Sequence, residues 1–194
     1  MDTIHEESSY VFESQIRECF AKVAWTFTSF QEEITRMANM NKYIFWAKII
    51  ASSISAFMAI YILKYPQGNK TFIMISVAIC SAIIAALELI YKEAGLQEKI
   101  NEYTLVASRL WSIRESYISL LTDIHSPGVN LEGLKVKRDK IQESLEAVYG
   151  KIPRTSQIAY DRATEKLHSE ASTLHEDEID HILPTALRRN KEST

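Results

Sequence analysis

Residues 43–63 read YIFWAKIIASSISAFMAIYIL, and residues 71–91 read TFIMISVAICSAIIAALELIY. Each stretch is predominantly apolar and contains one charged residue, Lys48 in the first and Glu88 in the second. A helix rises about 1.5 Å per residue, so either stretch extends about 30 Å, the thickness of the hydrocarbon core of a bilayer. The sequence therefore predicts a transmembrane hairpin over residues 43–91, with helices at 43–63 and 71–91.

The connector between the two stretches, KYPQGNK at residues 64–70, is short and contains the helix breakers Pro66 and Gly68. Such a connector places both ends of the chain on one side of the membrane. Lysine and arginine favour the cytoplasmic side, and the bias is modest: the outer flanks carry Arg36, Lys42, Lys92 and Lys99, and the connector carries Lys64 and Lys70. The stronger argument is bulk, because 42 residues precede the hairpin and 103 follow it with no export signal. We therefore expect a two-pass membrane protein with both termini in the cytoplasm.

Composition alone would not reveal the membrane segment. The chain has 194 residues, 46% of them apolar, and a formal net charge of −3, which is near the average for soluble proteins. It contains only five glycines and four prolines, which favours long helices, and no stretch alternates like a strand. The predicted fold class is all-α: a two-helix transmembrane hairpin whose long helices extend into a cytoplasmic helical bundle.

Two apolar stripes predict how the cytoplasmic helices pack. Residues 1–42 are expected to form an amphipathic helix, because apolar residues recur every three or four positions at Phe12, Ile16, Cys19, Val23, Phe27, Phe30, Ile34 and Met37. After the hairpin, a heptad stripe contains Val106, Leu110, Ile113, Tyr117, Leu120 and Ile124, in what could be one helix from residue 71 to 125. The two stripes are expected to pack against each other.

Residues 92–176 are predicted to complete this cytoplasmic bundle. A third helix follows the N-cap residue Asn130, ends at Gly150 and has the apolar face Leu134, Ile141, Leu145 and Val148. A fourth helix starts near Thr155 with the apolar residues Ile158, Ala163, Leu167, Ala171 and Leu174. Residues 177–194 are expected to be a polar C-terminal tail whose last ten residues are disordered.

The two charges of the hairpin are predicted to lie at similar depth. By helix rise, Lys48 and Glu88 lie about 22 and 25 Å from the connector, close to the cytoplasmic face. They can pair within one hairpin or between neighbouring subunits, which avoids the roughly 2.5–3.5 kcal/mol that an isolated charge costs at the bilayer centre. The alternative is that each side chain extends separately to the lipid headgroups.

Small residues recur every four positions on both membrane helices, at Ala47, Ala51, Ser55 and Ala59 and at Ala78, Ala82 and Ala86. Such stripes allow helices to approach closely in lipid, either within one hairpin or in an oligomer. Lys48, Ser52 and Ser55 share one helix face, as do Ser81, Ala85 and Glu88, so repeated hairpins could line a polar path. The predicted gating or pore-lining residues are Lys48, Ser52, Ser55, Ser81 and Glu88. Alternatively, the serines donate to carbonyls of the preceding turn.

No motif predicts catalysis. The run HEDEIDH at residues 175–181 begins like a zinc-protease motif, but Ile179 stands where the second histidine is needed. We interpret it as a solvated helix end, with weak metal binding as the alternative. Cys19 and Cys80 are far apart in the predicted layout, so no disulfide is expected. The sequence predicts no catalytic residue, no cofactor and no metal.

One basic cluster could contact an anionic ligand such as a nucleotide or single-stranded nucleic acid. Its residues are Lys135, Lys137, Arg138, Lys140, Lys151 and Arg154, with acidic residues interleaved among them. Such a mixture is more typical of a solvated helix face. In the tail, Arg188, Arg189 and Lys191 could instead contact anionic lipid.

Three stretches together resemble one known family: the hairpin, the stalk LVASRLWSIRESYISLL at residues 105–121, and KIPRTSQIAYDRATEKL at residues 151–167. With an amphipathic N-terminal helix before them, they resemble the SMODS- and SLOG-associating two-transmembrane effector family, SLATT, over about residues 8–175. The resemblance rests on architecture and diffuse pattern, because no invariant catalytic motif marks the family.

The resemblance implies an effector of bacterial antiviral defence in the inner membrane. Such an effector would oligomerise, form a pore or disrupt the membrane, and halt the infected cell by abortive infection. The implied trigger is a nucleotide or nucleic-acid signal, or the enzyme that makes it, a cyclic-oligonucleotide synthase or a reverse transcriptase. The residues alone also allow a non-conducting membrane anchor that recruits a partner through its cytoplasmic helices.

Overall fold

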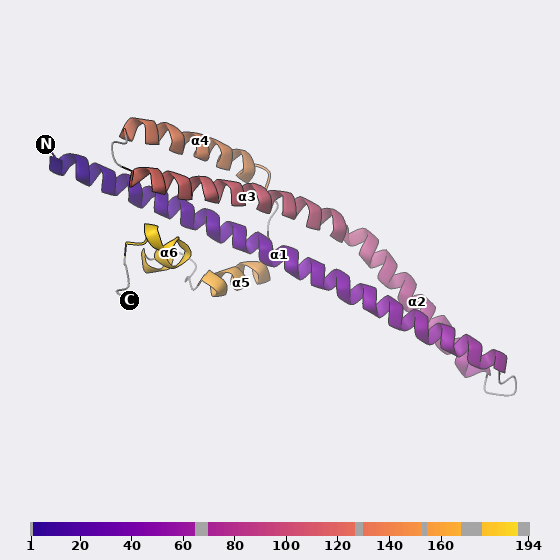
Figure 1. Ribbon diagram of the computed structural model, residues 1–194. Helices are drawn as coiled ribbons and strands as arrows, with labels where there is room; N and C mark the ends of the chain where they lie inside the picture. The colour runs from indigo at the N-terminus through magenta and orange to yellow at the C-terminus, as the bar shows by residue number, and fades with distance from the viewer. Residues whose placement is uncertain (1, 65–69, 127–129, 153–154, 168–175, 190–194) are drawn as a thin grey trace. The chain divides into compact units, whose positions relative to one another are not determined.

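A computed structural model describes residues 2–64, 70–126, 130–152, 155–167 and 176–189 of the chain (Figure 1). In chain order, its helices are α1 (Asp2–Lys64), α2 (Lys70–Ala94), α3 (Leu96–Ile124), α4 (Leu131–Tyr149), α5 (Gln157–Leu167), α6 (Glu176–Ile182) and the 3-10 helix η1 (Thr185–Leu187). Within those residues every regular element is a helix, which confirms the predicted all-α fold class.

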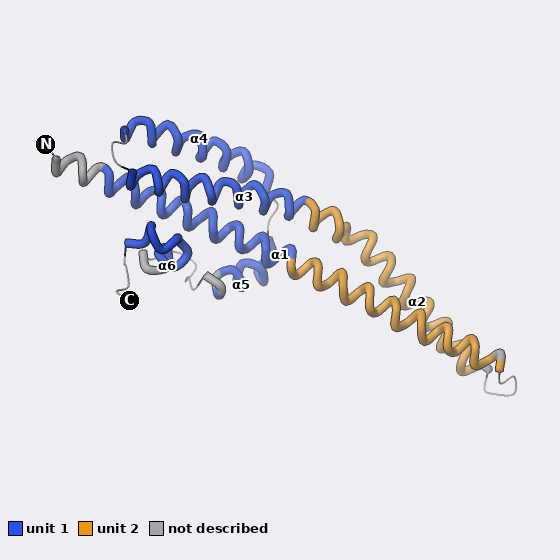
Figure 2. Tube along the Cα trace, viewed as in Figure 1, with its two compact units in different colours: residues 1–34, 102–194 blue, residues 35–101 orange. Residues whose placement is uncertain are grey.

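The chain divides into two compact units, which Figure 2 shows in different colours. The hairpin unit is Thr35–Asn101, and the bundle unit combines Met1–Ile34 with Glu102–Thr194. Helix α1 contributes residues to both units, because it continues from Asp2 to Lys64 without interruption.

In the hairpin unit, α1 and α2 pack along a seam with heptad spacing. Half-buried positions recur in steps of three and four, at Asn41, Ile44, Lys48, Ala51, Ser55, Met58 and Ile62 on α1 and at Ile73, Val77, Cys80, Ile84, Leu87, Tyr91 and Ala94 on α2, with Ser76 half-buried beside them. A repeat of 3.5 residues keeps one stripe of each helix facing its neighbour, as in left-handed helix pairs. The seam thus defines which face of each membrane helix is left for other contacts.

This seam corrects the simple interpretation of the small-residue stripes. Of the predicted stripe on α1, Ala51 and Ser55 lie in the seam but Ala47 and Ala59 are exposed, and all of the stripe on α2 is exposed, at Ala78, Ala82 and Ala86. The stripes therefore do not face each other within the hairpin. The physical reason is that larger residues at heptad positions of α2, such as Ile84 and Leu87, fill the contact with α1.

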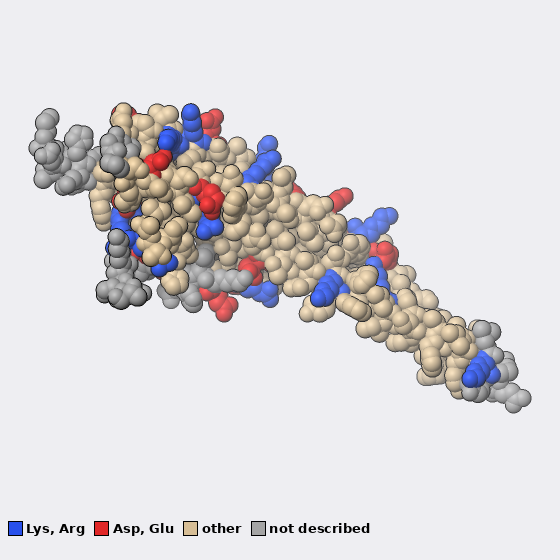
Figure 3. Space-filling model, in the orientation of Figure 1, with Lys and Arg blue, Asp and Glu red and all other residues tan. Residues whose placement is uncertain are grey.

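The outer surface of the hairpin is apolar. Two helical stretches, Ser9–Ile62 and Thr71–Ile124, each contain a segment that is long and apolar enough to cross a membrane, and neither segment is buried inside the chain. Large apolar side chains are exposed at Phe45, Ile50, Phe57 and Ile60 on α1 and at Phe72, Met74, Ile79, Leu89 and Ile90 on α2. Figure 3 shows a long part of this surface without Lys, Arg, Asp or Glu. Helices that contact lipid have such a surface.

The expected single helix from residue 71 to 125 is interrupted at one residue. Helix α2 ends at Ala94 and α3 begins at Leu96, and Gly95 between them has a φ of +56°. Glycine adopts this left-handed conformation at little cost because it has no Cβ. The amide of Lys99 donates to the carbonyl of Gly95 at 3.0 Å, which starts the hydrogen bonding of α3.

Gly95→Ala is expected to lower the free energy of unfolding by about 1 kcal/mol, because an L residue is strained at this φ. Crowding adds little, since the nearest atom to an added Cβ is Glu98 Oε2 at 3.9 Å. The control is Gly133→Ala in α4, where nothing lies within 4 Å of the added Cβ. That change should raise the stability by about 0.5 kcal/mol. Unfolding of the full chain in detergent, followed by circular dichroism, measures both effects. If the two substitutions changed the free energy of unfolding in the same direction, the left-handed conformation of Gly95 would be contradicted.

The core of the bundle unit is formed by the predicted stripes of α1 and α3. Buried residues include Phe12, Ile16, Val23 and Phe30 from α1 and Val106, Leu110, Ile113, Tyr117 and Leu120 from α3. The rings of Phe30 and Tyr103 meet edge to face at 5.3 Å, and the guanidinium of Arg114 lies 5.8 Å from the ring centroid of Phe20. The expected packing of the two stripes is confirmed for this unit.

Helix α4 has the predicted caps. The amide of Glu132 donates to Asn130 Oδ1 at 3.1 Å, and the amide of Gly150 donates to the carbonyl of Glu146 at 2.9 Å. The predicted apolar face is also confirmed, with Leu134 and Val148 buried and Ile141 and Leu145 half-buried. At its end, the hydroxyls of Tyr149 and Thr26 lie 3.1 Å apart, which joins α4 to α1.

Helix α5 begins near the predicted position. Of the apolar residues named for it, Ala163 is buried, together with Ala159, whereas Ile158 is exposed. The packing of Tyr160 against Trp25, with ring centroids 4.3 Å apart, fixes the rotation of the helix. Ser156 donates to the buried Glu33 and accepts from the amide of Ala159. The side chain of Leu167, together with Ala171 and Leu174, lies outside the described residues.

The end of the chain differs from the predicted polar tail. Residues 178–189, here called the C-terminal segment, include α6 from Glu178 onward and η1, and they bury Ile179, Asp180, Leu183 and Leu187. The expected disorder of the last ten residues is therefore wrong for residues 185–189. The three apolar side chains recur in steps of four and are buried in the bundle unit. Arg17 of this unit donates to the carbonyl of Leu187 at 2.8 Å. Residues 190–194 lie outside the described part of the chain.

Candidate functional site

The two charges of the membrane hairpin form an ion pair in the structure. Lys48 on α1 donates to Glu88 on α2, so the two side chains meet within one hairpin. The ammonium of Lys48 also lies 4.8 Å from the ring centroid of Tyr91, a cation–π contact. Sequence reasoning anticipated the pairing but missed Tyr91, which follows Glu88 by one helical turn and could have been found by that spacing.

The two members of the pair are not equally covered. Lys48 lies at a seam position with a side chain 24% exposed, whereas Glu88 lies outside the seam and is 62% exposed. An exposed carboxylate on an apolar helix surface can contact a second hairpin without disturbing the α1–α2 seam. The two charges therefore compensate each other within one chain, and the carboxylate of Glu88 is still accessible from outside it.

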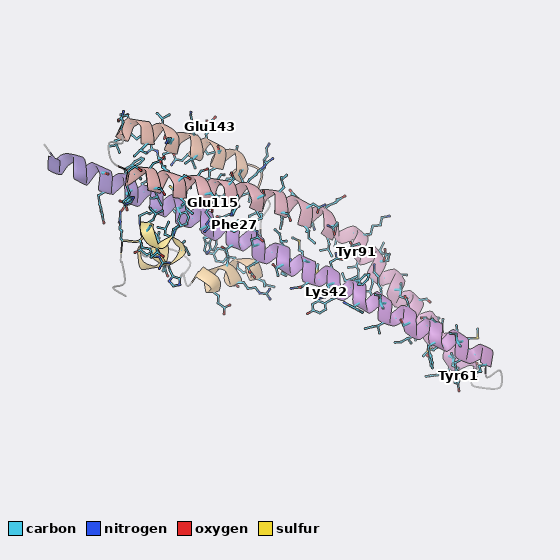
Figure 4. The ribbon with its side chains drawn as sticks, viewed as in Figure 1. Phe27, Lys42, Tyr61, Tyr91, Glu115 and Glu143 are labelled. Atoms are coloured by element: carbon cyan, nitrogen blue, oxygen red, sulfur yellow. The ribbon has the colours of Figure 1, made fainter. Side chains whose placement is uncertain are left out.

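Residues typical of the membrane interface bracket this pair. Lys42, Tyr43 and Trp46 are exposed on α1 near the pair, and Tyr61 is exposed at the opposite end of the hairpin. Figure 4 shows Lys42 and Tyr91 at one end and Tyr61 at the other. Tyrosine, tryptophan and lysine favour the boundary between headgroups and acyl chains. By helix rise, Lys48 lies about 9 Å inward from Lys42, so the pair lies just inside the apolar core.

The serines predicted to line a polar path have different environments. Ser55 lies in the seam and donates to the carbonyl of Ala51 at 3.0 Å, which matches the alternative that serines bond to the preceding turn. Ser53 and Ser76 do the same with Ile49 and Phe72. Ser52 and Ser81 are exposed on the outer surface. The structure thus brings Lys48 and Glu88 together but does not gather the serines around them.

The basic cluster of α4 is largely occupied by acidic neighbours. Lys135 pairs with Glu132 at 2.8 Å, Lys137 with Asp123 at 2.7 Å, and Arg138 with Asp139 at 2.7 Å. Arg138 also donates to Gln15 at 3.2 Å. Lys140 and Lys151 are exposed, and Arg154 lies outside the described residues. This arrangement favours a solvated helix face, and the contact with an anionic ligand stays a prediction.

A second charged site, which sequence reasoning missed, lies in the core of the bundle unit. Arg17 of α1 is 0% exposed, pairs with the buried Asp180 and donates to the carbonyl of Leu187. Nearby, Arg189 donates to Glu13 Oε1 at 3.2 Å and to the hydroxyl of Tyr10 at 3.2 Å. The signal in the sequence was an arginine on the same helix face as Phe20 and Ala24, where a buried cation requires a partner.

This site changes the interpretation of the HEDEIDH run. Ile179 and Asp180 from this run are buried, so the prediction of a solvated helix end is wrong for these two residues, whereas His181 is exposed. His175 lies outside the described residues, and the described residues contain no group of three or more His, Cys, Asp and Glu that could hold a metal. The tail arginines also have protein partners, since Arg188 donates to the carbonyl of Leu183 at 3.1 Å.

The two cysteines are not joined by a disulfide. Burial raises the pKa of the Cys19 thiol, which lies in the bundle unit. Burial and the neighbouring Cys19 also raise the pKa of Tyr117. A thiol with a raised pKa contains little thiolate at neutral pH, so Cys19 is a poor nucleophile.

Comparison with known proteins gives one family. The model of the SMODS and SLOG-associating 2TM effector domain family 4 matches residues 12–178, which include both membrane helices and most of the bundle unit. No curated protein and no solved structure matches the chain.

Proposed function

Because the chain belongs to the SMODS and SLOG-associating 2TM effector domain family 4, we propose that it is a membrane effector of a bacterial antiviral defence system. In this proposal several copies assemble in the inner membrane and permeabilise it when a trigger arrives. Both termini and the bundle unit lie in the cytoplasm, where the infection is sensed. Loss of membrane integrity then halts the infected cell.

The ion pair between Lys48 and Glu88 carries this proposal. An ionisable residue in a transmembrane segment is costly, and such residues commonly serve ion pathways or gating. A hairpin that only anchors a protein needs neither charge. Within one chain the pair is neutral, and Glu88 remains exposed on a surface that is otherwise apolar. In an assembly, its carboxylate can instead contact the Lys48 of a neighbouring copy.

A change from pairing within one hairpin to pairing between copies would give the assembly two arrangements with different energies. In the resting arrangement, Lys48 and Glu88 pair within one hairpin. In the open arrangement, the charges pair between copies and lie beside a polar path that the exposed Ser52 and Ser81 help to form. A trigger opens the path only if it binds the second arrangement more tightly than the first. We propose a nucleotide or nucleic-acid signal, or the enzyme that makes it, for this role, with the exposed Lys140 and Lys151 as candidate contacts.

The test is a measurement of membrane potential. Cells that express the chain with the genes that flank it are infected with phage and followed with a voltage-sensitive dye. We expect loss of the potential before lysis, and no loss in infected cells that lack the chain. An unchanged potential during infection would contradict the proposal, as would a strictly monomeric chain in lipid nanodiscs from triggered cells.

One observation favours a non-conducting anchor as the second candidate. Ser55, a predicted pore-lining residue, lies in the seam and donates to a carbonyl of its own helix, which favours a packing role over a pore-lining role. Exchange of residues 43–91 for an unrelated two-helix membrane anchor separates the two candidates. Protection against phage should disappear if the hairpin permeabilises the membrane, and it should persist if the hairpin only tethers the bundle unit.

A further inference from the structure

We propose that the C-terminal segment, residues 178–189, is a releasable lock that holds the N-terminal part of α1 in the resting bundle unit. Residues 179–189 lie beyond the match to the family, which ends at residue 178. The regulatory part of the proposal rests on the proposed membrane activity. The contact itself can be tested without it.

The segment is attached to one face of α1 through charged groups at both of its ends. Near its start, Asp180 pairs with the fully buried Arg17. At its end, Arg189 donates to Glu13 and stacks on Tyr10, with the guanidinium carbon 4.3 Å from the ring centroid. Tyr10, Glu13 and Arg17 are spaced by three and four residues, so they share one helix face.

The two attachments are also connected to each other. The amide of Arg189 donates to Asp180 Oδ1 at 3.0 Å, so the same carboxylate oxygen accepts from both Arg17 and the end of the segment. Loss of the Asp180 charge would therefore weaken both attachments together. Asp180 thus connects the two ends of the segment through Arg17 and the backbone amide of Arg189, while the guanidinium of Arg189 keeps its own partners, Glu13 and Tyr10.

The segment depends on docking for its structure. Helix α6 has seven residues and η1 has three, and helices this short are marginal alone in water. Only Ile179, Leu183 and Leu187 add buried apolar side chains. Release would therefore convert an ordered segment into a disordered one, which is an established type of switching transition.

Release would also leave Arg17 without the carboxylate of Asp180. Removal of one member of a buried ion pair is strongly destabilising, so the face of α1 around Arg17 would rearrange. That face belongs to the same uninterrupted helix as Lys48. The lock thus acts on the helix that also forms the membrane hairpin.

Hydrogen exchange measured by mass spectrometry tests the contact in the full chain in lipid nanodiscs. Asp180→Asn removes the charge while keeping the shape. We expect amides of residues 180–189 to exchange at least about 10-fold faster, and amides of residues 103–121 to remain protected, which shows that the bundle unit stays folded. The matched control is Asp161→Asn, because Asp161 is exposed on α5 and accepts only from a side chain of its own helix among the bonds described, Gln157 Nε2. Unchanged exchange of residues 180–189 in Asp180→Asn would overturn the proposal.

A compensating variant keeps the test valid if Asp180→Asn disturbs folding. Replacement of a buried ion pair by apolar residues of similar size is often neutral. Arg17→Met combined with Asp180→Leu should therefore restore slow exchange of the segment. Fast exchange in this double variant, with residues 103–121 still protected, would contradict the inference that the contact between positions 17 and 180 holds the segment.

The regulatory role is tested in uninfected cells with the voltage-sensitive dye. We expect Asp180→Asn to lower the membrane potential without phage, and the double variant to behave like the wild type. If Asp180→Asn releases the segment but the potential stays normal until infection, the segment is only a structural cap and the regulatory inference is wrong. If the wild type never changes the potential, the proposed function fails and the regulatory inference fails with it, while the exchange data still decide the contact.

Discussion

Leu110→Ala is expected to lower the free energy of unfolding of the bundle unit by about 2–5 kcal/mol. Leu110 is 0% exposed and belongs to the α3 stripe that packs with α1. Removal of a buried leucine side chain loses its transfer free energy and leaves a cavity that neighbours fill only in part. For a unit of this size, the loss corresponds to a fall of roughly 10–20 °C in the melting temperature.

Leu105→Ala is the matched control, because it makes the same chemical change on the same helix. Leu105 is 56% exposed, and surface substitutions usually change stability by less than about 0.5 kcal/mol. Both variants can be melted as full-length proteins in the same detergent and followed by circular dichroism. Equal destabilisation by the two changes would mean that the stripe of α3 does not face the core as described.

The stripes of α1 and α3 could be predicted from the sequence because water defines one side of each helix. Burial of an apolar side chain such as Leu110 or Ile16 is favourable because it removes the side chain from water. The spacing of apolar residues along the helix therefore shows which face is buried. The same argument holds for the caps of α4. Asn130 binds an amide of its own first turn, and a contact this local is determined by neighbouring residues alone.

The faces through which the two membrane helices contact each other could not be predicted in the same way. Lipid is as apolar as leucine, so hydropathy does not distinguish the seam from the lipid-exposed surface. The stripe of Ala78, Ala82 and Ala86 is regular, but the seam instead uses the heptad positions of Ile84 and Leu87. The pairing of Lys48 with Glu88 was predictable because their similar depth follows from counting residues along an antiparallel hairpin.

The docking of the C-terminal segment depends on contacts between residues far apart in the sequence. Asp180 meets Arg17, which lies more than 160 residues earlier, and no local pattern specifies that partner. A polar tail was predicted for residues 177–194 because this part of the sequence is rich in charged residues. The apolar residues Ile179, Leu183 and Leu187 indicated a buried face, but Pro184 interrupts the helical pattern between the last two, so the periodicity was easy to miss.

Lys48→Ala is expected to impair the membrane protein more than Glu88→Ala, although both remove the same ion pair. Without Lys48, the short side chain of Glu88 is left charged inside the apolar segment, at an expected cost of about 1–3 kcal/mol, or roughly 5- to 150-fold in the population of the correctly packed hairpin. Without Glu88, the longer Lys48 can extend to the nearby headgroups. Membrane-fraction yield and protease protection of the connector measure this difference.

Two double variants then separate assembly of the hairpin from its activity. Lys48→Ala with Glu88→Ala leaves an apolar hairpin, so membrane insertion should recover fully, while loss of membrane potential during infection should be abolished if the charges gate a path. Lys48→Glu with Glu88→Lys re-forms the pair with its members exchanged and should recover both insertion and activity, because the two positions remain opposite each other. Full activity of the uncharged double variant would remove the pair from the mechanism, because the membrane would then lose its potential although neither charge is present to distinguish a resting arrangement from an open one.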